Sequence, residues 1–214
     1  GAVRAAPSPD SWEMREWLYG VEKRECEDRL IEAWSASRFP ATRLRLPMIN
    51  GERDHYARIR GYLLRLSDGA PLLVPEEPGP PLRHLDQVDV VAGVIHLLES
   101  GAGTGEAYNL AADEAWPFDD FLARLATVAG VEPVVVRRSR AALAAAGVFP
   151  ACSPFSNPWM SVLDNSRARA ALGLTFTPQD ATLERVVAHC RATPSLIPPG
   201  YEAARERERR LAAA

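Results

Sequence analysis

Residues 105–130, GEAYNLAADEAWPFDDFLARLATVAG, contain a short strand pattern followed closely by a helix pattern. The strand is predicted over GEAYNLA and the helix over PFDDFLARLATVAG. The helix has a proline at its start and Gly130 as its stop. Its inward-facing residues recur at helical spacing, and they are Phe118, Phe121, Leu122, Leu125 and Val128. The segment therefore predicts one strand–helix unit of an α/β protein.

The same alternation extends in both directions along the chain. A long helix is predicted from about residue 11 or 13 to residue 37, with an apolar stripe of Leu18, Val21, Cys26, Leu30 and Trp34. The further elements are a strand over 41–49, a helix over 54–69, a strand over 70–75, a helix over 86–100 with Val88, Val91, Ala92, Ile95 and Leu98 on one face, a strand over 132–138, and helices over about 139–146, 166–172, 179–192 and 200–212. The last helix is rich in both charges and is expected to be solvated.

The composition is that of an ordinary soluble globular protein. The chain has 214 residues, of which 47% are apolar and 25% charged, and its net charge is −3. This balance gives no general attraction to nucleic acid or to an anionic membrane, and no apolar run is long enough to span a bilayer. Three widely spaced cysteines favour reduced thiols in a cytoplasmic protein. The four histidines show no metal-ligand spacing, so no metal site is predicted.

A glycine-rich stretch, ESGAGTGEAYN, resembles a phosphate-binding loop at first sight because Gly101, Gly103 and Gly105 alternate. A dinucleotide fingerprint follows a strand and opens a helix, whose N-terminal amides hold the pyrophosphate. Here the glycines follow a helix and precede a strand, so they lie at the negative end of the helix dipole. We therefore interpret them as a helix cap and a turn.

Tyr19 and Lys23 are four residues apart on the first predicted helix and therefore share a face. A free tyrosine ionises near pH 10, and a nearby ammonium group stabilises a phenolate. Such a pair can act as acid and base in a nicotinamide-dependent enzyme. The spacing alone also fits two ordinary residues on a solvated helix face.

The surroundings of this pair resemble a known family. Five segments in order, YGVEKRECE (19–27), TRLRLPMINGERD (42–54), VDVVAGVIHLLES (88–100), GEAYNLAADE (105–114) and DNSRARAALGLTFTP (164–178), are similar to the C-terminal half of the extended short-chain dehydrogenase/reductase family. These are NAD-dependent epimerases and dehydratases that act largely on nucleotide sugars. The resemblance implies the last helix and strand of a Rossmann-type parallel sheet (1–50), a smaller mixed α/β substrate-binding domain (51–197) and a charged C-terminal helix (198–214).

The resemblance also implies roles for individual residues. Tyr19 matches the catalytic tyrosine, and Lys23 matches the lysine that also binds the nicotinamide ribose. Residues 45–51 resemble the family's R-x-x-N-x-x-G segment, whose backbone meets the nicotinamide carboxamide. The implied cofactor contacts are therefore Pro47, Met48 and Ile49, although Met48 stands where the family has asparagine. The implied substrate contacts are Asn50 and Arg83, the second of which is also well explained as a surface residue.

The chain departs from the family pattern ahead of its third helix. Where the family has H-V-D-D, we read DQVD at 86–89, so the histidine and the first aspartate are expected to be missing. Asp89 then matches the acidic residue that opens the helix, a position that a capping carboxylate would fill equally well. Asn109 matches the family's Y-N-[IL] strand end and is expected to be structural.

The sequence also lacks a glycine fingerprint and a Ser or Thr on a strand before Tyr19. One hypothesis is that the chain is part of an NAD- or NADP-dependent epimerase, dehydratase or reductase. In that case the chain is expected to be inactive without the cofactor-binding half. The other is a non-catalytic interaction module with the same fold. The partners implied by the first are a small-molecule substrate such as a nucleotide sugar, the missing half on this or another chain, and a second copy in a homodimer. An isolated chain is expected to self-associate through its uncovered face or to be poorly soluble.

Overall fold

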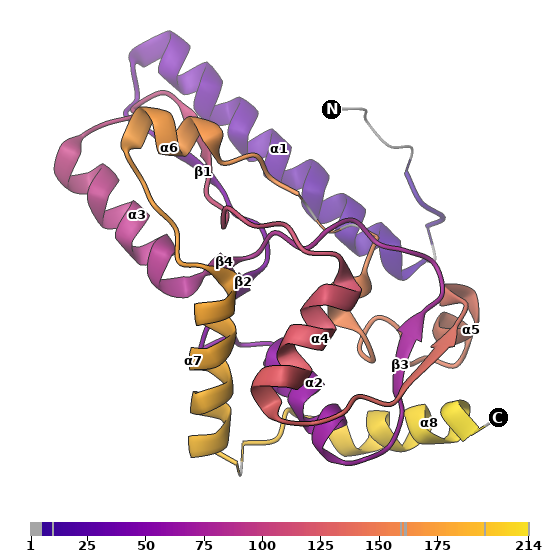
Figure 1. The fold of residues 1–214 in the computed structure, drawn as a ribbon. Helices are drawn as coiled ribbons and strands as arrows, with labels where there is room; N and C mark the ends of the chain where they lie inside the picture. Colours follow the sequence, from indigo (N-terminus) through magenta and orange to yellow (C-terminus); the bar gives the residue numbers. More distant parts are fainter. Residues whose placement is uncertain (1–5, 10, 159, 161, 195, 214) are drawn as a thin grey trace.

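The protein was analysed as a computed structural model, which describes residues 6–9, 11–158, 160, 162–194 and 196–213. The described chain is mixed α/β, with helices around short parallel strand pairs (Figure 1). The predicted fold class is therefore confirmed. The helices are α1 (Trp12–Ser37), α2 (Arg58–Ser67), α3 (Gln87–Ser100), α4 (Phe118–Ala129), α5 (Arg140–Ala145), η1 (Pro154–Ser156, a 3₁₀ turn), α6 (Ser166–Leu172), α7 (Gln179–Ala192) and α8 (Tyr201–Ala213).

The strands form three parallel pairs, each of two strands. They are β1 (Arg43–Arg45) with β5 (Ala107–Asn109), β2 (Ile49–Asn50) with β4 (Leu85–Asp86), and β3 (Leu72–Pro75) with β6 (Val135–Arg138). The single strand predicted over 41–49 is thus two strands, because the chain leaves β5 after Arg45 and joins β4 at Ile49. Pro47 lies in the break and has no N–H to donate to a ladder. The two-residue strand β4 is too short for a period-2 pattern to predict.

The largest core cluster joins α2, α4 and α7 beside β3. Phe121, Leu122 and Leu125 of α4 are buried in it, as the opening segment predicts. The rings of Phe121 and Phe155 lie 5.6 and 5.4 Å from the ring of Tyr62, measured between ring centres. Burial of this apolar surface is the main stabilising contribution to this part of the molecule.

The prediction of which face of α3 points inward is wrong. Val91 and Leu98 are 58% and 79% exposed, and Val88 and Ile95 are exposed as well. The helix instead packs with Val90 and Leu97 against the cluster around β1, β5 and α6. Because α3 is apolar on two sides, periodicity alone could not decide which side faces inward. We refer to Val88, Val91, Val94, Ile95 and Leu98 as the outer α3 stripe.

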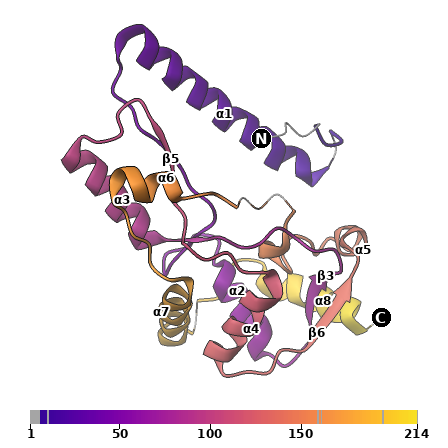
Figure 2. The ribbon, with the colours of Figure 1, turned by 45° about the horizontal axis from the view of Figure 1, so that its top comes forward.

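We expect this outer α3 stripe to mediate self-association of the isolated chain. An exposed, nearly continuous apolar helix face is typical of an interaction surface. Sedimentation velocity of the unsubstituted chain should show dimers or larger species, and Leu98→Glu should shift the distribution toward monomer. Val134→Glu is the control, since Val134 is also exposed but precedes β6, away from α3 in Figure 2. A monodisperse monomer at high concentration for the unsubstituted chain would contradict this prediction.

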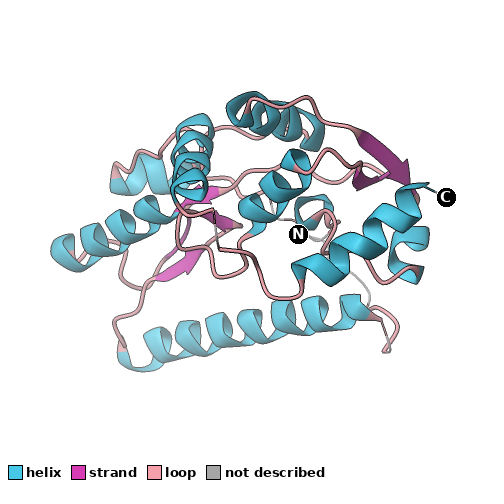
Figure 3. Cartoon of the chain, turned by 90° about the horizontal axis from the view of Figure 1, so that it is seen from below, coloured by secondary structure: helices cyan, strands magenta, loops and turns pink. Residues whose placement is uncertain are grey.

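Helix α1 runs along one edge of the molecule (Figures 2 and 3). It has the predicted extent, but none of its described side chains is buried. Leu18 and Cys26 of the predicted stripe are exposed, whereas Val21, Leu30 and Trp34 are partly covered. Trp34 holds the helix near its C-terminal end by packing against Gly105. A Cβ atom built on Gly105 would lie only 2.5 Å from the ring of Trp34. The residues around 101–105 form the predicted cap and turn, with Gly101 left-handed at the end of α3.

Helix α8 is not the solvated helix that its charges predict. Arg205 and Glu208 are 1% and 0% exposed, and they join Arg65 and Asp68 in an ion-pair cluster. Arg65 donates two hydrogen bonds to Glu208, at 2.9 and 2.6 Å, and Arg205 donates two to Asp68, at 2.7 and 2.8 Å. The cluster fastens α8 to α2 and to the turn after it. Tyr201 adds an aromatic contact with the guanidinium of Arg65.

Asp68 should make stability depend on pH at the acidic end. Burial would raise the pKa of its carboxyl, but hydrogen bonds from Arg205, the Ala70 backbone and Arg209 lower this pKa to about 2. An aspartate in the unfolded chain has a pKa near 3.9. The stabilisation is therefore complete above about pH 4 and lost as pH falls toward 2, by about 1–2 kcal/mol.

Urea unfolding midpoints measured from about pH 5 to pH 2 check this expectation. The decline in stability between about pH 4 and pH 2 should be smaller in Asp68→Asn than in the unsubstituted chain. Asp120→Asn, which removes an exposed carboxylate on α4, should leave the pH profile unchanged. Identical profiles for Asp68→Asn and the unsubstituted chain would contradict the assignment.

Candidate functional site

Tyr19 and Lys23 lie side by side on α1, with the Lys23 ammonium nitrogen 5.4 Å from the centre of the Tyr19 ring. Both side chains are exposed, Tyr19 to 60%. Their four-residue spacing continues to Glu27, so these three residues occupy one face of the helix. The phenol and the ammonium group are therefore both accessible to a ligand on that face.

An ion pair joins this helix to β1. Arg45, the last residue of β1, donates hydrogen bonds of 2.8 and 2.6 Å to the two carboxylate oxygens of Glu27. The hydrogen bond from Arg45 lowers the pKa of Glu27, against the opposing effect of burial. The ion pair therefore places the Glu27 end of this face beside the end of β1.

Part of the predicted cofactor-binding segment, residues 47–49, already makes contacts within the chain. Met48 packs against the largest core cluster, and its carbonyl accepts a hydrogen bond of 3.0 Å from the Leu85 N–H. Pro47 has no N–H to offer, and Ile49 belongs to β2. The backbone at 47–49 therefore keeps only part of its hydrogen-bonding capacity for a ligand.

Arg83 stabilises two loops. Its guanidinium donates to the carbonyls of Leu163 at 2.9 Å and Asp113 at 3.2 Å, and the side chain is half-buried. These two hydrogen bonds give Arg83 a structural role that requires no phosphate ligand. A contact with substrate diphosphate stays a prediction.

The residues ahead of α3 carry the most extensive polar network near the predicted site. Asp86 caps α3 by accepting from the Val88 N–H at 2.9 Å, and its side chain is fully buried. It also accepts hydrogen bonds from Thr182 and Arg185. Arg185 donates in addition to Glu52, at 2.6 Å, and so joins α7 to the loop after β2.

This network shows that Asp86, rather than Asp89, caps α3, and the departure from H-V-D-D stays a prediction. The helix opens at Asp86 rather than at Asp89, whose carboxylate accepts instead from the backbone N–H and the hydroxyl of Thr177. His84, Leu85 and Asp86 directly precede the helix, and Gln87 is its first residue. An aspartate directly before the apolar helix is the sequence signal for this cap.

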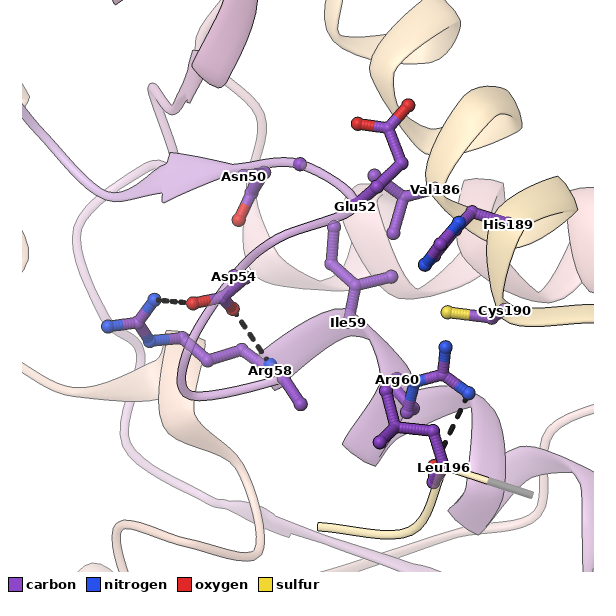
Figure 4. Close-up of a pocket in the computed structure, with 12 residues that line it drawn as sticks. Asn50, Glu52, Asp54, Arg58, Ile59, Arg60, Val186, His189, Cys190 and Leu196 are labelled. Carbon is purple, nitrogen blue, oxygen red and sulfur yellow. Dashed lines mark hydrogen bonds and ion pairs between the residues drawn. The ribbon is translucent and has the colours of Figure 1, made fainter. Parts of the chain in front are cut away.

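A cavity lies between the loop after β2, the start of α2 and the end of α7, and Asn50 lines it (Figure 4). Its charged side chains already have partners: Asp54 pairs with Arg58, and Arg60 donates to the Thr193 and Leu196 carbonyls. The Cys190 thiol faces the same space, and burial raises its pKa despite the nearby Arg60 charge. The cavity therefore offers little free charge for a phosphate or a metal ion.

The described residues were also searched for two other kinds of feature. No group of three or more His, Cys, Asp or Glu side chains among them is arranged to hold a metal ion. Within the same residues, every helix is too short or too polar to cross a bilayer.

Comparison with solved structures identifies the fold. The chain superimposes on UDP-glucose 4-epimerase of Thermotoga maritima, solved with UDP-glucose, with a TM-score of 0.65 and 20% identity, over 82% of this chain and 54% of the epimerase. This chain has an epimerase-like fold. It matches dTDP-glucose 4,6-dehydratase of Bacillus anthracis, solved with NAD, with a TM-score of 0.67 and 13% identity over 90% of this chain and 56% of the dehydratase.

A third solved structure is also similar to this chain in fold. RMD of Pseudomonas aeruginosa, solved with NADPH, has a TM-score of 0.63 and 17% identity over 82% of this chain and 56% of RMD. The chain thus spans somewhat more than half the length of these proteins. No protein-family model and no curated protein sequence matches it. At these identities the comparisons establish the fold, and the roles of Tyr19, Lys23 and the other predicted residues stay predictions.

Proposed function

We propose that this chain is the substrate-binding part of an NAD(P)-dependent epimerase, dehydratase or reductase that acts on a nucleotide sugar. The observation that carries the proposal is the accessible Tyr19–Lys23 pair on a chain with an epimerase-like fold. The structures solved with UDP-glucose, NAD and NADPH support the classes of substrate and cofactor.

In this proposal Tyr19 is the acid and base. Its hydroxyl exchanges a proton with a substrate hydroxyl, and the Lys23 ammonium group stabilises the phenolate form by its positive charge. When bound, the nicotinamide cofactor supplies the acceptor or donor of hydride. Lys23 fits the ribose of such a cofactor because its ammonium group is exposed and carries three hydrogen-bond donors. Ile49, Met48 and Pro47 fit less well, for the reasons given above.

The chain is proposed to work with a dinucleotide-binding half, on the same polypeptide or on a partner. Two surfaces support this. The parallel pair β1–β5 has only two strands, whereas parallel sheets are normally extended and covered by helices. The outer α3 stripe is apolar and uncovered. The proposed division into 1–50, 51–197 and 198–214 places β1 in the first part, although β5, from the second, lies beside it.

The test begins with the reading frame upstream of Gly1. A G-x-x-G-x-x-G pattern within roughly 150 residues supports the proposal, because that motif follows a strand and holds the pyrophosphate. The polypeptide that contains both parts is then assayed for hydride transfer with NAD or NADP and UDP-glucose or dTDP-glucose. Calorimetry of the present chain alone should detect no NAD binding.

Within that polypeptide, Tyr19→Phe should lower kcat about 100-fold, the size of effect expected on removal of a general acid or base. Tyr56→Phe is the matched control, because Tyr56 is also an exposed tyrosine, 69% accessible, beside a cationic side chain. Equal activity of Tyr19→Phe and the unsubstituted enzyme would contradict the assignment. Micromolar NAD binding by the isolated chain would contradict the need for a second half and leave Tyr19 to be judged by its own variant.

A further inference from the structure

One residue of α1 can compete with Tyr19 for the ammonium group of Lys23. The residues three and four positions from Lys23, which are its neighbours on the helix surface, are Tyr19, Gly20, Cys26 and Glu27. Glu27 alone among them is acidic. A lysine and a glutamate four residues apart on a helix can form an ion pair. Such a pair would place a negative charge beside the ammonium group and weaken its attraction for a phenolate.

The Glu27 carboxylate is held instead by strand β1. Arg45 donates hydrogen bonds of 2.8 and 2.6 Å to its two oxygens, a two-point contact that fixes the direction of the carboxylate as well as its position. Among the described residues, the ion-pair partners of Glu27 are Arg45 and Arg43, and Lys23 is not one of them. The Lys23 ammonium nitrogen lies 5.4 Å from the centre of the Tyr19 ring.

The two arginines of β1 contribute unequally to this contact. They are two residues apart on a strand and therefore point to the same side. The nearest Arg43 nitrogen is 4.0 Å from the carboxylate, and the Arg43 guanidinium donates to the Gly105 carbonyl at 3.3 Å. Arg45 lowers the pKa of Glu27 through its hydrogen bond and, against the effect of burial, through its charge, and Arg43 adds a smaller effect. Arg45 is therefore the residue that decides where the carboxylate lies.

We propose that Arg45 is a positioning residue, which keeps the Glu27 carboxylate away from Lys23 and so leaves the Lys23 ammonium group free to act on Tyr19. The consequence for Tyr19 rests on the function proposed above. The competition between Arg45 and Lys23 for Glu27 does not, and it can be measured in the present chain. Because the Arg45 side chain is 51% exposed, its replacement should leave the fold intact.

The competition is measured by ¹³C NMR titration of the Glu27 carboxyl group in the present chain. With Arg45 in place, Lys23→Met should leave the titration midpoint of Glu27 nearly unchanged. In Arg45→Met the carboxylate can turn toward Lys23, so adding Lys23→Met should raise the midpoint by about 0.2–0.4 pH units, the size expected of a helical ion pair. Arg29→Met is the matched control, because it removes another arginine that pairs with a glutamate, Glu32, and Lys23→Met should have no added effect there.

Two results of this titration overturn the proposal. One is a Lys23→Met effect of the same size with and without Arg45. The other is no effect in Arg45→Met, which would mean that Glu27 stays with Arg43. If Arg45→Met fails to fold, the comparison of Lys23→Met with the unsubstituted chain still decides, since a shift of the full size in the presence of Arg45 overturns the proposal and its absence supports it.

The consequence for Tyr19 is measured in the polypeptide that contains both parts. Arg45→Met should lower kcat/KM at neutral pH about three- to tenfold and move its rise with pH upward, because a phenolate is less stable beside a neutralised ammonium group. Adding Glu27→Gln should restore most of the activity and the pH profile, which would not happen if the ion pair only anchored α1. Failure of this restoration overturns the proposal. If every form of that polypeptide is inactive, the proposed function fails, and the Glu27 titration still decides the role of Arg45.

Discussion

Glu208→Gln should lower the free energy of unfolding by about 3–5 kcal/mol, the usual effect of removing one partner from a buried ion pair. Glu208 is 0% exposed and receives hydrogen bonds from Arg65 and Arg205, so the neutral amide leaves two buried guanidinium groups without their shared carboxylate. Urea unfolding followed by circular dichroism measures the change. Thermal unfolding of the same variant should shift to lower temperature.

Glu206→Gln is the matched control for this variant. Glu206 lies on the same helix and pairs with Arg210 at 2.9 Å, but its side chain is 53% exposed. Exposed pairs of this kind contribute about 0–1 kcal/mol, so the control should be close to the unsubstituted chain. Similar losses in both variants would show that helix propensity, rather than the buried cluster, holds α8 in place.

Arg185→Met should lower the free energy of unfolding by about 2–3 kcal/mol. The variant leaves the fully buried Asp86 carboxylate with only the Thr182 hydroxyl and the Val88 N–H as partners. The expected loss is smaller than for Glu208 because Arg185 is itself 34% exposed. Equilibrium unfolding in urea provides the measurement.

A second substitution separates charge from packing. Adding Asp86→Asn to Arg185→Met should restore part of the lost stability, since the buried group is then neutral. Arg191→Met on the same helix serves as the control, because Arg191 is exposed and donates only to the Val128 and Ala129 carbonyls. If the double variant is less stable than the single one by the full cost of Asp86→Asn alone, the two residues are not coupled.

Helix positions were predictable where a helix has one apolar face and clear end signals. The predictions for 166–172 and 179–192 coincide with α6 and α7. Of the residues predicted to face inward on α4, Phe121, Leu122 and Leu125 are buried, and Phe118 and Val128 are partly buried. The face of α3 was not predictable, because Val90 and Leu97 on one side and Val91 and Leu98 on the other are equally apolar. Which side is covered depends on tertiary contacts that periodicity does not contain.

The burial of charged residues on α8 was not predictable, for a related reason. Single-sequence patterns treat Arg205 and Glu208 as solvated, since such residues are rarely buried unless paired. Their partners, Arg65 and Asp68, lie on and just after another helix, and only the folded chain brings them together. The Tyr19–Lys23 pair was predictable because both members lie on one helix, whereas the Asp86–Arg185 contact joins residues distant in sequence.

The pairing of the strands also governs how the chain reaches its fold. Arg43 pairs with Ala107, Ile49 with Leu85 and Leu72 with Val135, so the strand pairs join segments far apart in the sequence. A long loop has to close before any of these ladders forms. The chain therefore loses conformational entropy before it gains the stabilising contacts between the strands. We expect helices such as α4 and α7 to form before the strands pair, because their contacts are local in sequence. During that interval the outer α3 stripe and the unpaired strand edges are exposed together, so folding at high concentration competes with aggregation.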